Sequence, residues 1–463
     1  MTIIKPLFLF FLFISMLGLS NGCATLPNVS EMIDETSPAR DPDQIVSFNG
    51  QLSPQKSKAV LDRLDQSGDP TDLLERHNAV VDSLTESPLT EGNKVTLLVD
   101  NQATYAAMFK AMQNAKDHIN LETFIIDDDE TGRRFADLLL KKRAEGVQVN
   151  LIFDSAGSFG TPASFFQRLR EGGIQVVEFN PVNPFKAHGH WRLAHRDHRK
   201  ILIVDGKVAL MGGINASEVC SGTPCRRSQD EKAPLPWRDT DIQIEGPAVA
   251  ELQKLFLASW LKQKGPELSG RTYFPDLKEE GNALIRIVGS TPGESNRVNF
   301  IAYVSAIIFA EHSVHMTNAY FVPDDQILNA LIDAARRGVD VKIILPSASD
   351  YSLALEAARY NYSELLNAGV KLFERRNALL HAKTAVIDGV WSTVGSSNMD
   401  FWSLLTDDEA DAVILSREFA IEMEKMFDRD LAESDRIQWK EWKKRPLLPR
   451  IREWLAHLLS HWL

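Results

Sequence analysis

HRKILIVDGKVALMGGIN (residues 198–215) returns 183 positions later as HAKTAVIDGVWSTVGSSN (residues 381–398). The histidine, the lysine, the aspartate, two glycines and the asparagine of the first stretch all recur in register in the second. Chance does not account for six coincidences of these residue types at one offset, so the chain is a tandem duplication. Because the duplicated element carries the polar residues, each copy is interpreted as half of one composite site.

Each copy predicts a β-hairpin, because an apolar, β-branched run leads into an Asp-Gly turn and a second run that ends in small residues. Side chains two positions apart share one face of a strand, so the histidine and lysine of each copy point the same way. The turn aspartates have the opposite parity, and we expect them to fix the turn and the strand end. The predicted catalytic motif residues are His198, Lys200, Asp205, His381, Lys383 and Asp388.

Two histidines, two lysines and two asparagines that converge predict an anion site, since ammonium groups and amide or hydroxyl donors suit phosphate oxygens. One imidazole can attack phosphorus and form a covalent intermediate, while the other protonates the leaving alcohol and then activates the incoming hydroxyl. The lysines supply the positive charge that Mg²⁺ would otherwise bring, so we predict no metal and no cofactor. Two idle surface histidines are the alternative, but they leave the recurring lysines and asparagines unexplained.

The doubled H-x-K-x4-D pattern resembles the phospholipase D superfamily, and the pairs Gly212-Gly213 and Gly395-Ser396 are closest to bacterial cardiolipin synthases. The resemblance covers roughly residues 94 to 430. It implies a phosphohistidine intermediate formed without a metal. It also implies an acidic residue soon after each motif that orients a histidine.

Glu409, eleven residues beyond Asn398, fits the place of that acidic residue in the second copy. Its counterpart is Asp239, 24 residues beyond Asn215, which implies a 13-residue insertion in the first copy. Trp402 differs from the basic residue that cardiolipin synthases usually carry at that position. The residues expected to bind or orient the phosphate are Asn215, Asn398, Ser396, Asp239 and Glu409.

The resemblance implies phosphatidyl transfer between phospholipids, with phosphatidylglycerol as substrate and phosphatidylethanolamine as a further candidate. Hydrolysis by a phospholipase D is the alternative, because it uses the same catalytic residues and differs only in whether water reaches the intermediate. A non-catalytic lipid-binding protein of the envelope is a third hypothesis. The retention of both complete motifs argues against it. The formal net charge of −12 argues against a nucleic-acid partner and hence against a nuclease.

Strands and helices alternate in both halves, and RAEGVQVNLIFD in the first half matches ARRGVDVKIILP in the second. This alternation predicts α/β layers with substantial parallel pairing. We expect two phospholipase D-like α/β domains, with mixed sheets flanked by helices, related by a pseudo-two-fold and sharing one active site at their interface. The expected ranges are 1–22 for a signal peptide, 23–93 for a tether and N-terminal helices, 94–265 and 266–435 for the two domains, and 436–463 for a C-terminal amphipathic helix.

The N-terminus carries one lysine followed by a short apolar run, residues 7 to 19, which predicts an export signal rather than a membrane-spanning helix. The context LSNGC resembles a bacterial lipoprotein cleavage site with Cys23 as the lipidated residue. Ordinary cleavage near Gly22 and an uncleaved anchor are the alternatives. Lipidation places the protein in the bacterial cell envelope, membrane-associated and facing the periplasm.

Cys220 and Cys225 both fall in the inferred insertion. Export to an oxidising compartment allows them to form a disulfide, whereas a cytoplasmic protein would keep two free thiols. The C-terminal stretch places Ile451, Trp454 and Leu458 on one face of a helix behind a basic lead-in. Such a helix suits a membrane interface, and docking on the protein itself or on a dimer partner is the alternative.

Two further residues flank the motifs. Glu122 begins the strand that should border the site, and it is interpreted either as a headgroup contact or as a solvent-facing strand residue. His195, three residues before His198, is expected to support the site from behind or to be solvated.

Overall fold

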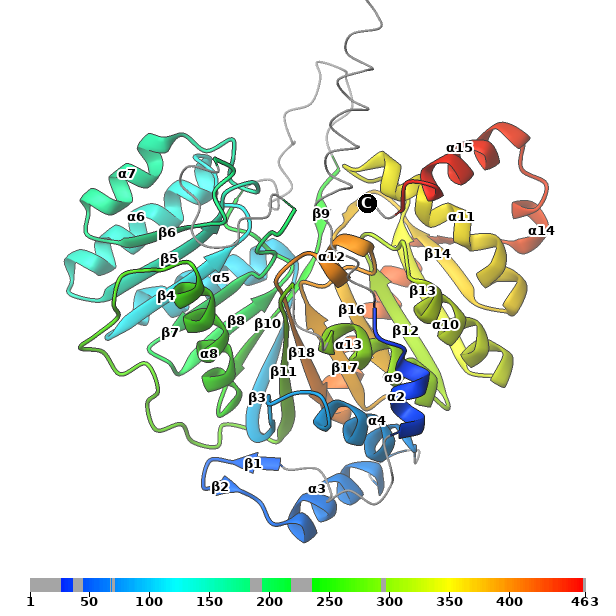
Figure 1. The fold of residues 1–463 in the computed structure, drawn as a ribbon, viewed down its shortest axis with the longest axis horizontal. Helices are drawn as coiled ribbons and strands as arrows, with labels where there is room; N and C mark the ends of the chain where they lie inside the picture. Colours follow the sequence, from blue (N-terminus) through cyan, green and yellow to red (C-terminus); the bar gives the residue numbers. More distant parts are fainter. Residues whose placement is uncertain are drawn as a thin grey trace, which may run out of the picture.

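The computed structural model describes residues 26–35, 45–66, 68, 71–183, 194–217, 235–292 and 297–460 (Figure 1). The predicted signal peptide, the lipidation site Cys23 and the cysteine pair Cys220 and Cys225 lie outside these ranges, so those three predictions stay predictions. Within the described ranges, no helix combines the length and the apolar content that a bilayer crossing requires.

The first half of the chain forms a mixed sheet in which antiparallel pairing gives way to parallel pairing. Only the last two pairs of neighbours are parallel. The order of its strands is β3 (Leu89–Val99), β10 (Thr240–Glu245), β8 (Val208–Gly212), β7 (Ile201–Val204), β4 (His118–Thr123), β5 (Gln148–Asp154) and β6 (Gln175–Phe179).

The second half repeats this order strand for strand, including the switch to parallel pairing at the same place. Its strands are β11 (Ala283–Ser290), β18 (Glu409–Leu415), β17 (Trp391–Gly395), β16 (Lys383–Ile387), β12 (Ser313–Asn318), β13 (Asp340–Pro346) and β14 (Lys371–Arg375), with β19 (Ser434–Arg436) added at the edge. The equivalent strands β3 and β11 pair antiparallel with each other and join the two sheets. The predicted fold class, two mixed α/β halves related by a pseudo-two-fold, is confirmed.

Helices cover both faces of each sheet (Figure 1). The first half carries α5 (Asp100–Asn114), α6 (Glu130–Ala144), α7 (Ala163–Glu171) and α8 (Ala248–Lys262). The second carries α9 (Val298–Phe309), α10 (Asp325–Arg337), α11 (Ser352–Ala368), the short α12 (Phe401–Leu405) and α13 (Arg417–Ala432). Gly338 and Gly369 end α10 and α11 in the left-handed conformation, as the sequence predicts for helix-closing glycines.

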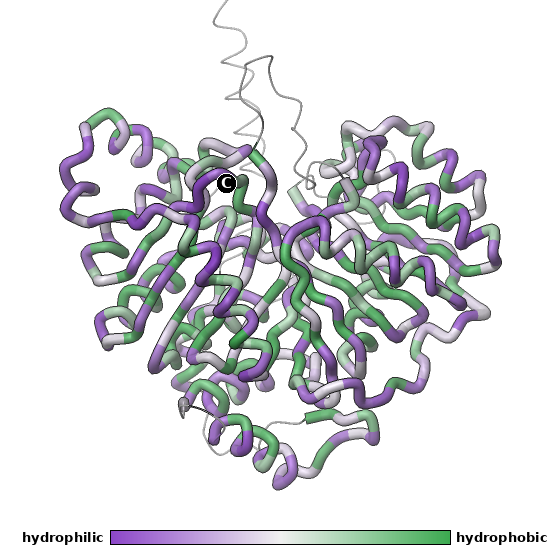
Figure 2. Tube along the Cα trace, turned by 180° about the vertical axis from the view of Figure 1, so that it is seen from behind, coloured by the Kyte–Doolittle hydropathy of each residue, from purple (hydrophilic) through white to green (hydrophobic). Residues whose placement is uncertain are grey.

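An apolar core lies between the two halves and fixes them against each other. It combines Phe256 of α8 and Ile242 of β10 with Ile414 of β18 and Met423 of α13. Figure 2 shows hydrophobic residues following the strands through the interior. Because interiors pack as densely as organic crystals, this contact holds the two copies of the motif in one geometry.

The N-terminal segment departs from its prediction. The sequence predicts a tether from residue 24 to about 60, yet α2 (Val29–Glu35) packs on α9, and β1 (Ile45–Ser47) pairs with β3 in parallel and with β2 (Gly50–Gln51). The Val29 N–H donates to Gln326 Oε1 at 2.9 Å. Buried apolar residues at both ends of this stretch explain why it folds onto the domain.

The leucines between about residues 54 and 85 have helical spacing, which predicts one or two short helices packed on the first domain. That placement is wrong. The helices are α3 (Pro54–Gln66) and α4 (Leu73–Asp82), and α4 packs on α9 of the second half. His77 of α4 lies in a buried chain of hydrogen bonds between Trp391 Nε1, 3.0 Å away, and Ser305 Oγ, 2.8 Å away. The sequence pattern shows that α4 needs an apolar partner but does not show which half provides it.

Candidate active site

Each motif histidine lies in an extended segment just before its hairpin, and this segment pairs with the other half of the molecule. The His198 N–H donates to the Asp408 carbonyl at 2.9 Å, and the His381 N–H donates to the Arg238 carbonyl at 2.8 Å. Near the second contact, β9 (Trp237–Arg238) and β15 (Leu379–Leu380) pair in parallel. The backbone therefore brings two segments from distant parts of the sequence to one place.

Both hairpins form as predicted. The turns at Asp205-Gly206 and Asp388-Gly389 have positive φ at both residues, with values of 53° and 63° in the first and 51° and 60° in the second. The register pairs Val204 with Val208 and Ile387 with Trp391, so each hairpin loop has three residues. Asp and Gly adopt the left-handed conformation of the first two positions more readily than most residues.

The two histidines are held by carboxylates that cross between the halves. His198 Nδ1 lies 2.9 Å from Glu409 Oε1, and His381 Nδ1 lies 2.7 Å from Asp239 Oδ2. Glu409 and Asp239 occupy equivalent register positions, because Asp241 opposes Gly212 and Asp411 opposes Gly395. Asp239 is therefore the positional counterpart of Glu409, and each acid contacts the histidine of the other half, which the sequence does not predict. Their role as orienting acids stays a prediction.

The two lysines lie beside the histidines and are buried, with 2% and 0% of their surface exposed. Lys200 Nζ donates to the carbonyl of His198, and Lys383 Nζ donates to the carbonyl of His381. Burial lowers the pKa of Lys200 to about 8. Each lysine also acts electrostatically on the histidine of the other half, so the four groups share one site.

The two half-sites differ in charge although they contain the same residue types. Burial raises the pKa of Glu409 to about 7, and burial together with both lysines lowers the pKa of His198 well below its usual range. In the other half-site burial also opposes ionisation of Asp239, but His381 and Lys383 outweigh it and hold the pKa of Asp239 below its usual value. Burial and Lys383 also lower the pKa of His381, but Asp239 opposes this shift. The His198 half-site therefore favours a neutral imidazole more strongly, and the His381 half-site keeps an ionised carboxylate beside its imidazole.

The motif aspartates point away from the histidines, at the turn end of each hairpin. Asp205 accepts hydrogen bonds from the backbone N–H groups of residues 116 to 118, at 2.7 to 3.0 Å for the shortest contact of each. Asp388 accepts from the N–H groups of residues 311 to 313 at 2.8 to 3.0 Å and from Thr71 Oγ1 at 2.7 Å. This is the turn-fixing position that their parity predicts.

The small residues after each hairpin differ because the orienting acids differ in length. Ser396 Oγ donates to Glu409, so this serine acts on the carboxylate rather than facing outward. At the equivalent Gly213 a Cβ atom would lie 2.3 Å from Asp239 Oδ1. The shorter aspartate therefore requires glycine, whereas the glutamate leaves room for a hydroxyl donor.

The two asparagines are buried at 3% and 5% exposure. Asn215 Oδ1 accepts from the Ile125 N–H at 3.0 Å, which ties the first motif to the end of β4. The Asn398 N–H donates to Ser403 Oγ at 2.8 Å, while its Oδ1 has no hydrogen-bond partner among the described residues. Their roles in phosphate binding stay predictions.

Sequence reasoning missed a pair of buried carboxyl groups behind the glycines. A Cβ atom on Gly212 would lie 2.2 Å from Asp241 Oδ1, and one on Gly395 would lie closer still to Asp411 Oδ1. Burial raises the pKa of Asp411 to about 6 and that of Asp241 well above its usual range. The signal that could have found them is their separation along the sequence, which equals the separation between Asp239 and Glu409.

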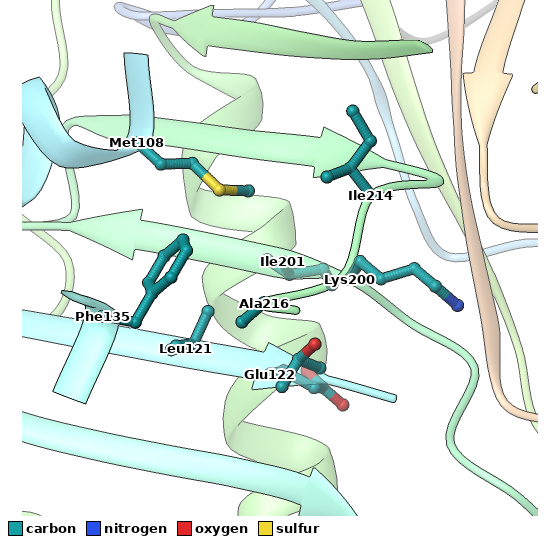
Figure 3. A pocket seen from close by; sticks show the side chains of 9 residues that line it. Met108, Leu121, Glu122, Phe135, Lys200, Ile201, Ile214 and Ala216 are labelled. Carbon is teal, nitrogen blue, oxygen red and sulfur yellow. The ribbon is translucent and has the colours of Figure 1, made fainter. Parts of the chain in front are cut away.

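Glu122 and His195 also have defined places. Glu122 is fully buried, so the interpretation as a solvent-facing residue is wrong, and a headgroup contact stays untested. Figure 3 shows Glu122 and Lys200 at the same end of a small cavity whose other lining residues are mostly apolar. His195 Nε2 lies 2.9 Å from Asp408 Oδ1, next to Glu409 in sequence, and its side chain is mostly buried, so the solvated alternative is wrong and support of the site stays a prediction.

Two facing histidine–lysine half-sites on a duplicated mixed α/β fold define a phospholipase D-like enzyme. The same fold occurs in the crystal structure of phosphatidylserine synthase from Haemophilus influenzae Rd KW20, with a TM-score of 0.59 over 82% of this chain and 98% of that one. Its sequence identity of 13% supports a likeness of fold alone.

The sequence comparisons define the family. The profile described as "Cardiolipin synthase, PLD-like domain" matches residues 108–220 and 303–431. The cardiolipin synthase of Alkalihalophilus pseudofirmus is 33% identical over 380 residues, 81% of this chain and 74% of that protein. Cardiolipin synthase A of Pseudomonas fluorescens is 34% identical over 380 residues, 81% of this chain and 76% of that protein. The chain belongs to the cardiolipin synthase family of phospholipase D-like proteins, and the prediction of a phosphatidyltransferase of this type is confirmed.

Proposed function

We propose that the chain makes cardiolipin from two molecules of phosphatidylglycerol through a phosphatidyl-histidine intermediate. The observation that supports this most is the crossed pairing of His198 with Glu409 and of His381 with Asp239 at one interface. A carboxylate at Nδ1 fixes an imidazole with its Nε2 atom directed into the site, as in other histidine-dependent transferases and hydrolases.

In the first step His198 Nε2 attacks the phosphorus of the donor lipid, and the bond from phosphorus to the glycerol headgroup oxygen breaks. His381 Nε2 gives its proton to that oxygen, so glycerol leaves as a neutral alcohol. Burial and the lysines lower the pKa of both imidazoles, but that of His198 more strongly, which favours His198 as the nucleophile because a nucleophile must be unprotonated. The ionised Asp239 beside His381 suits an imidazole that must carry a proton.

In the second step the headgroup hydroxyl of another phosphatidylglycerol loses its proton to His381 and attacks the same phosphorus. The bond from phosphorus to His198 Nε2 then breaks, which releases cardiolipin and restores the enzyme. Lys200 and Lys383 hold the phosphoryl oxygens, since an ammonium has three donors and the histidine carbonyl takes one. Asn215 and Asn398 belong to the same phosphate site in this proposal.

Product analysis tests the proposal. Purified protein incubated with phosphatidylglycerol in mixed micelles is expected to release cardiolipin and glycerol in equal amounts, and addition of phosphatidylethanolamine shows whether it also serves as a substrate. The variant His198→Asn provides the control for background. Phosphatidic acid and glycerol without cardiolipin would instead assign the hydrolase activity, because water would then accept the phosphatidyl group.

We also propose that the C-terminal helix α15 (Leu447–His457) rests on the membrane surface. The helix docks on α11 through Glu453 and Ala456, which are buried, and His457 stacks on Tyr360. Its other face exposes a continuous apolar strip of Leu447, Leu448, Ile451, Trp454, Leu455, Leu458 and Leu459. Docking on the protein, the alternative considered from sequence, therefore leaves this strip uncovered in the described part of the chain.

Basic residues border the apolar strip, although the whole chain is acidic. The exposed ones are Lys440, Lys443, Lys444, Arg450 and Arg452. An apolar face with tryptophan and a basic border suits an anionic lipid surface, to which each basic residue contributes about 1 kcal/mol. Attachment through Cys23 and a periplasmic location would add to this contact and remain proposals.

Vesicle flotation tests the role of α15. The protein without residues 1–22 is expected to bind vesicles containing phosphatidylglycerol, and the double variant Trp454→Glu, Leu455→Glu to lose about tenfold or more in partitioning. Ile421→Glu is the matched control, because Ile421 is exposed to a similar degree on α13, outside this strip. Equal vesicle binding by the double variant and the wild type would show that α15 does not contact the membrane.

A further inference from the structure

Arg199, the residue between His198 and Lys200, is buried at 3% exposure and contacts three separate parts of the fold. Its Nε donates to the Glu409 carbonyl at 3.0 Å. One terminal nitrogen donates to Ser259 Oγ of α8 at 3.0 Å, and the other donates to the Ser290 carbonyl at the end of β11 at 2.9 Å. Arg199 therefore joins the backbone of the orienting acid Glu409 to both halves of the molecule.

Two buried acids accompany this arginine. Asp197 Oδ1 accepts from the Arg199 N–H at 3.2 Å, and Glu122 faces the same group from β4. The two carboxyl groups lie within hydrogen-bonding range of each other, and the Ser259 side chain also interacts with Glu122. Two carboxylates cannot bond to each other unless one holds a proton, and burial raises the pKa of both groups, so the pair carries at most one negative charge opposite Arg199.

The second half of the molecule shows that the fold does not need this cluster. At the equivalent positions of the second motif Arg199 is replaced by Ala382 and Asp197 by Leu380, and the strand register places Thr317 where Glu122 lies. Leu380 and Ala382 belong to a small apolar core. Because well-packed apolar residues replace buried ion clusters without loss of stability in many proteins, the cluster in the first half requires another explanation.

The backbone of the other orienting acid is held differently. The Asp239 carbonyl accepts from the Asp100 N–H at 3.0 Å and from the guanidinium of its own neighbour Arg238. Arg238 in turn pairs with Asp430 at 2.7 Å. Within the described residues, only the His198 half-site uses an arginine from the histidine's own segment. The segment therefore binds Glu409 at two points, through His198 Nδ1 and through Arg199 Nε.

We propose that Arg199 is a positioning residue for the His198 half-site: it fixes the backbone of Glu409, and Glu409 holds His198 Nδ1 in the orientation for attack on phosphorus. Glu122 and Asp197, together with the nearby Asp408, supply the negative charge that keeps the guanidinium in place. This inference rests on the proposed function for its kinetic consequence. A displacement of about 1 Å in the attacking atom is enough to cost about 100-fold in rate, which sets the expected effect.

The first test compares variants in the phosphatidyl transfer assay. Arg199→Ala is expected to lower kcat about 100-fold with KM changed less than about threefold, and Arg199→Lys or added guanidinium ion to restore part of it. Arg286→Ala is the matched control, because Arg286 is equally buried but binds Asp82 in a different part of the fold. It should reduce thermal stability without a loss of kcat or a response to guanidinium.

Two combinations separate positioning from a structural role. Because Arg199 acts through Glu409, the double variant Arg199→Ala, Glu409→Gln should be no slower than the slower of the two single variants. The triple variant Glu122→Thr, Asp197→Leu, Arg199→Ala installs the residues of the second half and should fold while still losing kcat. Multiplied losses in the double variant, or full kcat in the triple variant, would overturn the inference.

A readout without activity keeps this inference distinguishable from the proposed function. In ¹⁵N-histidine spectra of the wild type, His198 is expected as the tautomer protonated at Nδ1, and Arg199→Ala should mix the tautomers while Arg286→Ala leaves them unchanged. If the protein made no cardiolipin but these spectra behaved as expected, the proposed function would fail and the positioning role would stand. An unchanged His198 signal in Arg199→Ala would reject the positioning role.

Discussion

At the scale of single residues, the site uses identical side chains for unequal tasks. The sequence predicts which histidines and lysines converge, because both copies keep them in register. It does not predict their charges, since these depend on burial and on a glutamate in one half-site where the other has an aspartate. Burial near a second cation is what moves pKa values at such sites, and a sequence does not show it directly.

The pH dependence of activity should report Lys200. In the proposed mechanism the ammonium form of Lys200 holds the phosphoryl oxygens, and burial lowers its pKa to about 8. Below that pH the group is charged, and as pH rises through it the charge is lost, so kcat/KM should fall with a midpoint near 8. Lys200→Arg keeps its charge and should move this alkaline limb upward in pH, whatever its maximal rate.

Lys207→Arg is the control for that profile, because Lys207 is exposed on the same hairpin. It should leave both the rate and the alkaline limb unchanged. An alkaline limb that stays at the same pH in Lys200→Arg would show that another group titrates.

At the scale of elements, the hairpin positions the chemistry and the aspartates hold the hairpin. The Asp-Gly turns, their parity and the repeat of the order of strands could all be predicted from the pattern of the sequence. The crossing of the orienting acids could not, because it depends on parallel contacts such as that of β9 with β15, which are too short to leave a pattern. The sequence likewise does not explain why Gly213 in one copy corresponds to Ser396 in the other, because this depends on the lengths of the neighbouring acids Asp239 and Glu409.

The motif aspartates should therefore matter for stability more than for catalysis. Asp205→Asn and Asp388→Asn each remove charge-assisted hydrogen bonds to three backbone N–H groups, with an expected cost of about 1.5 to 3 kcal/mol in the free energy of unfolding. Asp388→Asn should cost more, since Thr71 also binds there. Denaturant unfolding checks the stability, and kcat at a temperature where both variants are folded should stay within about threefold.

A loss of more than about 100-fold in kcat without a loss of stability would contradict this assignment and return the aspartates to the chemistry. Lys207→Ala in the first turn serves as the control for changes at the turn itself, because its side chain is exposed.

At the scale of the whole molecule, duplication explains why a single site needs both halves. The pairing of β3 with β11 and the apolar core between the halves fix the positions of the two histidines relative to each other. The sequence predicts this pseudo-two-fold from the constant offset between the two motifs alone. It does not predict that α4 packs on the second half, because an amphipathic helix shows that it needs a partner and not which one.

The most direct test of the account is to trap the covalent intermediate. With a phosphatidyl ester of p-nitrophenol, the leaving group departs without an acid, so His381→Asn should release one equivalent of nitrophenol and stop, because no base activates the acceptor. Mass spectrometry should then find the phosphatidyl group on the peptide that contains His198, and the mirror variant His198→Asn should release no nitrophenol and carry no label. A label on His381 in His198→Asn, or continued turnover by either variant without a labelled histidine, would contradict the two-half-site mechanism.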